Sequence, residues 1–155
     1  MNDALTLFRQ YKDPVYRLAL SMTGSPADAE DVCQTVFLKL LEKQPRLAPD
    51  KERAWLLRVT ANQCRSLWRL LRRRPTVPLE EALELAAPQG TPLLRQIMEL
   101  PAKDRAVLYL HYYEGFSTRE VGKLLHISQS AVTTRLLRAR KKLKEALGED
   151  FQYET

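Results

Sequence analysis

The chain has 155 residues, 45% of them hydrophobic and 28% charged, with 25 Lys and Arg against 19 Asp and Glu. A length near 150 residues suits one ordinary domain or two small ones, and this apolar fraction excludes global disorder. No apolar run approaches the roughly 20 residues that cross a bilayer, residues 1–13 lack the apolar segment of a secretory signal, and the two cysteines offer no disulfide framework or Cys-based zinc site. We therefore expect a cytosolic protein.

The basic charge falls into two blocks. Residues 1–75 hold 14 Lys and Arg against 8 Asp and Glu, residues 76–90 hold none against 3, and residues 91–155 hold 11 against 8. Two basic blocks around an acidic spacer indicate two domains that meet the same long anion. We expect these domains at 1–74 and 92–155, joined by a Pro-containing linker at 75–91.

Apolar positions recur every three or four residues almost throughout the chain, which predicts an all-α fold. The first helix has an apolar stripe of Phe8, Tyr11, Val15, Leu18 and Met22. Pro14 is expected to kink or restart this helix, because proline lacks the backbone N–H that an unbroken helix uses.

Two more helices are predicted in the N-terminal half. Ser25 is expected to cap the second helix, which ends at Gln44. Its buried positions are expected to be Ala29, Val32 or Cys33, Val36, Phe37 and Leu40. Asp50 is expected to cap a long third helix that runs to about Arg74.

The C-terminal half predicts a helix-turn-helix. One helix is expected from near Pro92 and another from Pro101 to Tyr113. The run Ser117–Glu120 matches the S-x-x-E capping box and opens a short helix. Ser128 then caps a last helix. The buried stripe of this last helix is expected to be Val132, Leu136, Ala139 and Leu143. Two helices joined by a tight turn, the second rich in polar side chains, form a DNA-binding motif.

The polar face of the last helix is suited to duplex DNA. Hydroxyl side chains near its start approach base edges closely in the major groove, and cations farther along reach phosphates. The candidates are Ser130, Thr133, Thr134, Arg135, Arg138, Lys141 and Lys142. The alternative is the solvated face of an ordinary helical hairpin.

The predicted third helix carries a second basic face. Its members are Arg58, Asn62, Arg65, Arg69 and Arg72, spaced four, three, four and three residues apart. A solubilising helix would mix Glu with Arg, yet no acidic residue occurs between Ala54 and Leu79. This pattern favours a nucleic-acid backbone. Trp55 is more typical of a core residue than of a base-stacking one, and Trp68 fits both roles equally.

Catalytic chemistry has no motif here. The two histidines, His111 and His126, have no companion at a ligand spacing, and no P-loop or nucleophile motif occurs. We expect a binding protein that is not an enzyme and needs no metal and no cofactor.

Four segments in series resemble bacterial RNA polymerase sigma factors of the extracytoplasmic-function (ECF) type. These segments are Thr23–Gln34, Ala54–Asn62, Leu100–Arg105 and Ser117–Leu143. The resemblance implies that residues 1–74 form sigma region 2, which docks on the polymerase beta-prime clamp helices and opens promoter DNA. It implies that residues 92–155 contain sigma region 4, which reads the upstream promoter element and touches the beta flap.

The resemblance also assigns roles to residues. Polymerase docking maps to Asp31, Gln34, Thr35 and Leu38. Engagement of the downstream promoter element maps to Arg53, Trp55, Arg58, Asn62 and Ser66, with Arg65 and Arg69 on the same basic face. Upstream recognition maps to Ser128 through Arg138, including Gln129. Region 2 would melt the duplex by capturing a flipped base, region 4 would supply duplex affinity, and the linker would set their spacing.

Alternatives remain open at this level. A two-module DNA-binding regulator that never contacts polymerase shares the C-terminal motif. Many ECF members are held inactive by an anti-sigma partner, and the sequence does not say whether this chain has one.

The chain also departs from the family pattern at four positions. Many members have Glu at the position of Thr35, Asp at Ser66, Gly at His126 and Ala at Gly122. We expect a positive φ at His126.

Overall fold

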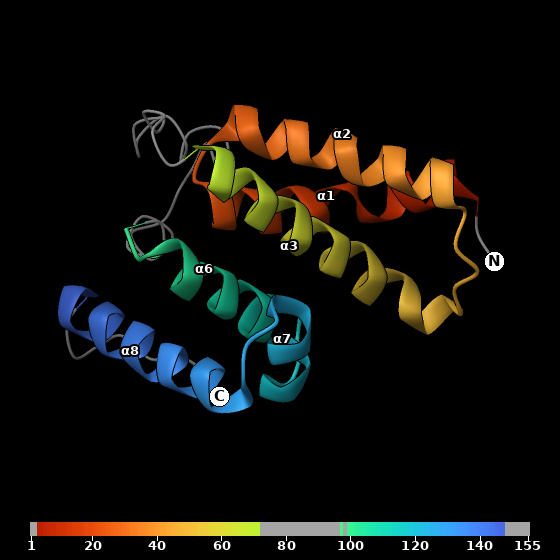
Figure 1. Ribbon diagram of the computed structural model, residues 1–155. Coiled ribbons are helices and arrows are strands. Elements are labelled where there is room, and N and C mark those ends of the chain that lie inside the picture. The colour runs from red at the N-terminus through yellow and green to blue at the C-terminus, as the bar shows by residue number, and fades with distance from the viewer. Residues whose placement is uncertain (1–2, 72–96, 98, 148–155) are drawn as a thin grey trace. The chain divides into compact units, whose positions relative to one another are not determined.

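The computed structural model describes residues 3–71, 97 and 99–147, and every regular element in them is helical (Figure 1). The chain divides into two compact units, Met1–Thr76 and Val77–Thr155. Each unit has its own apolar core. The expected linker at 75–91, the start of a helix near Pro92 and Arg72 to Arg74 lie outside the described residues.

Three α-helices make up most of the described part of the first unit: α1 (Ala4–Thr23), α2 (Pro26–Lys43) and α3 (Glu52–Leu71). They lie side by side (Figure 1), and each contacts both of the others. Each helix turns an apolar face inward, so Val15, Val36 and Leu56 are fully buried between them. The prediction for α2 is confirmed: Ala29, Val32, Val36, Phe37 and Leu40 are buried, and Cys33 is half-buried.

Local signals determine where these helices end. The Ser25 side chain accepts a hydrogen bond of 3.3 Å from the backbone N–H of Asp28, which confirms it as the cap of α2. The predicted end of α2 at Gln44 is also confirmed, because this residue takes the left-handed conformation with φ of 42°. Gly24 closes α1 in the same conformation.

Two expectations for α1 were wrong, the restart at Pro14 and the burial of Phe8, while the alternative of a kink at Pro14 stays a prediction. The helix does not restart at Pro14 but continues through it to Thr23. Its packing against α2 and α3 holds the backbone helical although one intrahelical hydrogen bond is missing. The side chain of Phe8 is 41% exposed, and Leu7 is buried instead. The Phe8 ring still contacts the ring of Phe37 on α2, with the ring centroids 4.8 Å apart.

The expected cap at Asp50 was also wrong. Pro49 begins a short 3₁₀ turn, η1 (Pro49–Lys51), and α3 follows at Glu52. Since the turn already has helical backbone before Asp50, this residue lies inside it and not at the non-helical position that a capping side chain needs.

The second unit contains α6 (Ala102–Leu108), the π-helical turn η2 (Tyr109–Tyr113), α7 (Thr118–Leu125) and α8 (Gln129–Leu147). The predicted helix over 101–113 is therefore present but ends in a wider turn. The predicted stripe of α8 is confirmed, because Val132, Leu136, Ala139 and Leu143 are all buried. They pack on α6 and α7.

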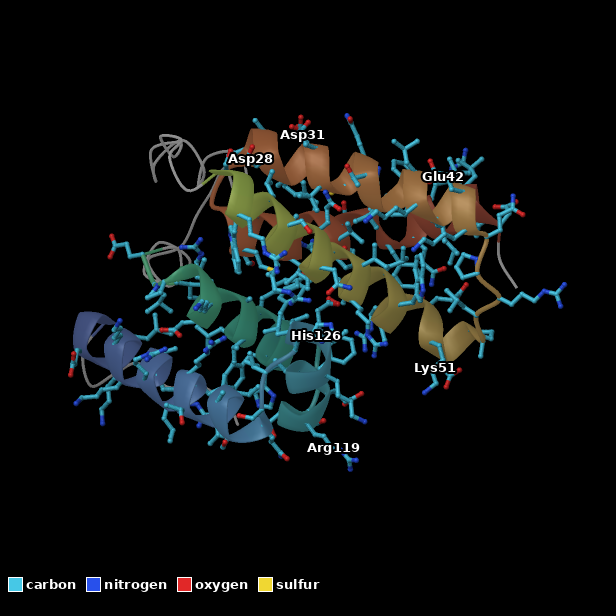
Figure 2. The ribbon with its side chains drawn as sticks, viewed as in Figure 1. Asp28, Asp31, Glu42, Lys51, Arg119 and His126 are labelled. Carbon is cyan, nitrogen blue, oxygen red and sulfur yellow. The ribbon has the colours of Figure 1, made fainter. Side chains whose placement is uncertain are left out.

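The turn between α7 and α8 is tightly specified. The expected capping box is present, with Ser117 and Glu120 each bonding the backbone of the other. Ser128 accepts a hydrogen bond from the N–H of Ala131 at 3.1 Å, which confirms the expected cap of α8. His126 has the expected positive φ, 58°. It is labelled in Figure 2.

Gly122 permits the two helices to approach closely. A Cβ atom built on it would lie 2.7 Å from the backbone oxygen of Ile127, in the turn itself. The Ile127 N–H also donates to the Gly122 oxygen at 2.9 Å. A backbone atom cannot rotate away as a side chain can, so only glycine fits this turn without a shift.

We expect Gly122→Ala to lower the free energy of unfolding by about 1–3 kcal/mol, because the methyl group overpacks the turn. Helix propensity alone predicts the opposite sign, a gain of about 1 kcal/mol. Urea unfolding followed by circular dichroism measures the change. Lys123→Ala, at the neighbouring exposed position, is the control and should stay within about 0.5 kcal/mol. Stabilisation by Gly122→Ala would contradict the close approach.

Candidate functional site

The outer face of α3 carries unburied basic and amide side chains. Arg58, Asn62, Ser66 and Arg69 are exposed, whereas Arg53, Trp55 and Arg65 are half-buried. The opposite face, with Leu56, Leu57 and Ala61, is fully buried. The structure thus brings the predicted downstream-element residues onto one helix with an apolar anchor behind them.

Asn62 is at the centre of this face. Its side-chain oxygen accepts a hydrogen bond from Arg65, and its backbone oxygen accepts one from the Ser66 hydroxyl at 3.2 Å. Burial lowers the pKa of the Arg65 guanidinium, and the nearby positive charge of Arg69 lowers it further. A polyanion placed against this face would relieve the repulsion between the two cations.

The two tryptophans of α3 differ. The indole N–H of Trp68 donates to the backbone oxygen of Met22 at 2.9 Å, which ties the end of α3 to the end of α1. This bond assigns Trp68 to packing, one of the two roles that the sequence left open. Trp55 is half-buried near the start of α3.

The hydroxyl groups of α8 are turned toward their own helix. Thr133 donates to the backbone oxygen of Gln129 at 3.1 Å, and Thr134 donates to that of Ser130 at 2.9 Å. Both residues are exposed. Because their donors are engaged, they present methyl groups and acceptor lone pairs outward. Leu137, 58% exposed, extends the same polar-apolar face.

The start of α8 is fixed to α7. The Gln129 amide donates to the Thr118 hydroxyl at 2.9 Å, and the Ser128 and Ser130 hydroxyls are 3.2 Å apart. Residues 128–130 are exposed. The first turn of α8 is therefore held rigidly while its outer surface stays open.

The cations of α8 have different surroundings. Lys141 and Lys142 are exposed, and Arg135 is half-buried. Arg138 forms an ion pair of 2.8 Å with Asp104, whose side chain is fully buried at the start of α6. Arg140, which the sequence reading did not single out, bonds the Tyr112 hydroxyl, and its guanidinium lies 5.2 Å from the centre of the Tyr112 ring.

A groove that sequence reasoning missed lies between α1 and α2. It has a volume of about 490 Å³ and is lined by Ala4, Leu5, Phe8, Gln34, Phe37, Leu38 and Leu41. Leu38 and Leu41 are 56% and 54% exposed. A signal for it existed, because Leu5 and Phe8, and again Leu38 and Leu41, are three residues apart.

The groove adjoins the predicted polymerase-docking residues on α2. Gln34 and Leu38 line it, and Asp31 is exposed one turn toward the start of the helix. Figure 2 shows Asp31 pointing away from α1 and α3. Thr35 is half-buried. The surface thus combines exposed leucines with a carboxylate and an amide, and exposed apolar patches rimmed by polar groups mark sites of protein contact.

The described residues show no group of three or more His, Cys, Asp or Glu placed to hold a metal ion. Within the same ranges, no helix combines the length and the apolar character that crossing a membrane requires.

We expect both cysteine thiols to have low reactivity in the folded chain. Burial raises the pKa of both Cys33 and Cys64 from 9.0 to about 12. Since the thiolate is the reactive form, the folded chain at pH 8 should react with iodoacetamide roughly 100-fold or more slowly than the chain in guanidinium chloride. Mass spectrometry of timed samples measures this difference. Equal rates in the two states would contradict the burial of the thiols.

Comparison with known proteins identifies the architecture. The model of sigma-70 region 2 matches residues 7–74, and that of sigma-70 region 4 matches residues 91–143. The chain belongs to the sigma-70 family. An ECF sigma factor is 30% identical over most of both chains, which places this chain in the ECF group. The two matched regions, in this order, support a promoter-directing function with RNA polymerase.

Individual relatives agree with this assignment. The ECF sigma factor SigL of Mycobacterium tuberculosis is 30% identical, over 92% of this chain and 88% of its own. SigE of Mycolicibacterium smegmatis is 29% identical over 91% of this chain, which spans 60% of the length of SigE. The sigma factor RpoE of Bartonella quintana, solved with the anti-sigma factor NepR, shares the fold with a TM-score of 0.68, at 22% identity over 93% of this chain and 96% of its own.

Proposed function

We propose that this sigma factor recognises two promoter elements through two basic surfaces and melts the duplex at the downstream element. The observation that carries the proposal is the division of labour between α3 and α8, each with one face buried and the other face exposed and basic. We assign region 2 to residues 1–74, the linker to 75–91 and region 4 to 92–155. We also propose that the sigma factor acts in the cytoplasm, where promoter DNA and polymerase occur together.

The upstream element is read by α8. Its start is rigid, and Ser130, Thr133 and Thr134 present small groups that approach base edges in the major groove. Lys141 and Lys142, farther along the helix, contact phosphates and so fix its register on the duplex.

The downstream element is opened at α3. Arg58, Arg65 and Arg69 attract the non-template strand, and Asn62 hydrogen-bonds an unpaired base. Trp55, half-buried near the start of the helix, stacks on a base that leaves the duplex. Because only the unpaired strand offers such contacts, its binding drives the duplex open.

Docking on core polymerase uses the outer face of α2, toward the beta-prime clamp helices, while region 4 meets the beta flap. The apolar groove supplies buried area once a partner covers it, and Asp31 and Gln34 at its edge supply polar specificity. We propose an anti-sigma factor as a further partner of this chain, since the structural relative RpoE was solved with one.

Run-off transcription tests the whole proposal. Purified core polymerase is incubated with the chain and a library of randomised promoters, and transcripts are sequenced. We expect initiation only when the chain is present, from templates that share an upstream and a downstream element. DNA binding without any redirected initiation would instead indicate a regulator that does not act through polymerase.

We expect Asn62→Ala to reduce open-complex formation roughly 10-fold, the effect of losing one base contact, while closed-complex affinity changes little. Permanganate reactivity of unpaired thymines measures opening, and a filter assay at low temperature measures closed-complex binding. Glu42→Ala, an exposed change on α2 that is labelled in Figure 2, is the control. Equal losses in both assays would remove Asn62 from the melting step.

We expect Leu38→Asp to weaken association with core polymerase roughly 10-fold or more, because a carboxylate must then be desolvated in the groove. The residue is exposed, so the free chain should keep its melting temperature. Fluorescence anisotropy of a labelled chain measures the affinity. Lys12→Ala, exposed on α1 and outside the groove, should bind as the wild type does. Unchanged binding by Leu38→Asp would contradict the docking surface.

A further inference from the structure

The pair formed by Asp104 and Arg138 has an unusual distribution of exposure. Nε of Arg138 donates to one carboxylate oxygen of Asp104 at 3.2 Å, and Nη2 donates to the other at 2.8 Å. The carboxylate is fully buried, yet the Arg138 side chain is 51% exposed. One edge of the guanidinium is therefore fixed inside the unit and the rest faces outward.

The outward edge retains hydrogen-bond capacity. A guanidinium has five N–H donors in one plane, and the carboxylate occupies two of them. The remaining three belong to Nη1 and Nη2, which point as a pair from the same plane. This is the geometry with which arginine grips guanine O6 and N7 or a phosphate.

Arg138 also lies on the exposed face of α8 that we propose contacts DNA. It follows Thr134 by four residues and precedes Lys141 by three, and both neighbours are exposed on α8. Asp104 lies 34 residues earlier, in the first turn of α6. Its position complements the positive end of α6, and in addition both of its oxygens are buried and bonded to Arg138.

We propose that Asp104 is a positioning residue that holds Arg138 in a fixed orientation for one base pair of the upstream element, through the bidentate pair between α6 and α8. A free arginine loses rotamer entropy when it binds a base, and here that freedom is already removed before DNA arrives. The hydrogen bonds and charge of the Asp104 carboxylate also raise the pKa of the Arg138 guanidinium. The inference rests on the upstream reading assigned to α8.

The test uses the reconstituted holoenzyme. A promoter selected by the wild-type chain is changed one base pair at a time across the upstream element, and closed-complex affinity is measured over a salt series. With Asp104→Asn we expect discrimination at one base pair to fall about 10-fold, while the salt slope stays unchanged, because the charge of Arg138 is retained. With Arg138→Ala we expect the same loss and a slope reduced by about 1.

Arg138→Lys keeps the proposal falsifiable if Asp104→Asn folds poorly. Lysine retains the charge but has no planar fork, so discrimination should fall at the same base pair with the slope unchanged. The matched control is Arg119→Lys, an exposed change on α7 that is labelled in Figure 2, which should alter neither quantity. The double variant Asp104→Asn with Arg138→Ala should lose no more discrimination than Arg138→Ala alone.

Three results overturn the inference. They are wild-type discrimination in both Asp104→Asn and Arg138→Lys, a uniform loss at every base pair together with lower thermal stability, and additive losses in the double variant. If the wild-type holoenzyme itself shows no upstream preference, the upstream role of α8 fails and this inference fails with it. If the wild-type holoenzyme has an upstream preference and the variants keep it unchanged, only this inference is overturned and the upstream role of α8 stands.

Discussion

Burial of one helical face is the constraint on which both units depend. In α3 the fully buried Leu56, Leu57 and Ala61 hold the helix against α1 and α2, and the arginines are left on the other face. In α8 the buried Val132, Leu136 and Ala139 do the same for a polar and cationic face. Since the charged faces contribute little to packing, each unit must take its stability from the apolar side, and the exposed side remains available for the DNA contacts that we propose.

The start of α8, where we propose that the upstream element is read, is held by several local contacts. The turn before α8 depends on a glycine with no room for a side chain, on a capping box and on a hydrogen bond from Gln129 to Thr118. The ion pair from Asp104 then fixes the middle of the helix from the side of α6. A side chain that is already oriented before binding loses less conformational entropy when it binds, and this favours affinity. The groove between α1 and α2 shows the opposite condition, an apolar surface whose burial requires a partner.

Local sequence signals predicted the helices well because their physics is local. Ser25, Ser117 and Ser128 cap helices as expected, and the stripe of α8 is buried as its spacing indicates. The errors at Pro14 and Phe8 have a different origin. A proline is tolerated in α1 because two neighbouring helices hold it. Phe8 is partly exposed because it lies at the open groove between α1 and α2, where its ring contacts that of Phe37. Both outcomes depend on residues far along the chain.

The amino-acid sequence by itself determined the all-helical class, the two basic blocks and the residues that face away from each core, because periodicity and charge are read within a few turns. Tertiary structure alone decided which polar groups far apart in the sequence meet. Trp68 bonds the backbone of Met22, 46 residues away, and Arg138 bonds Asp104, 34 residues away. The physical reason is that hydrogen bonds and ion pairs need geometry within a few tenths of an ångström, and only the packing of whole helices sets distances that finely.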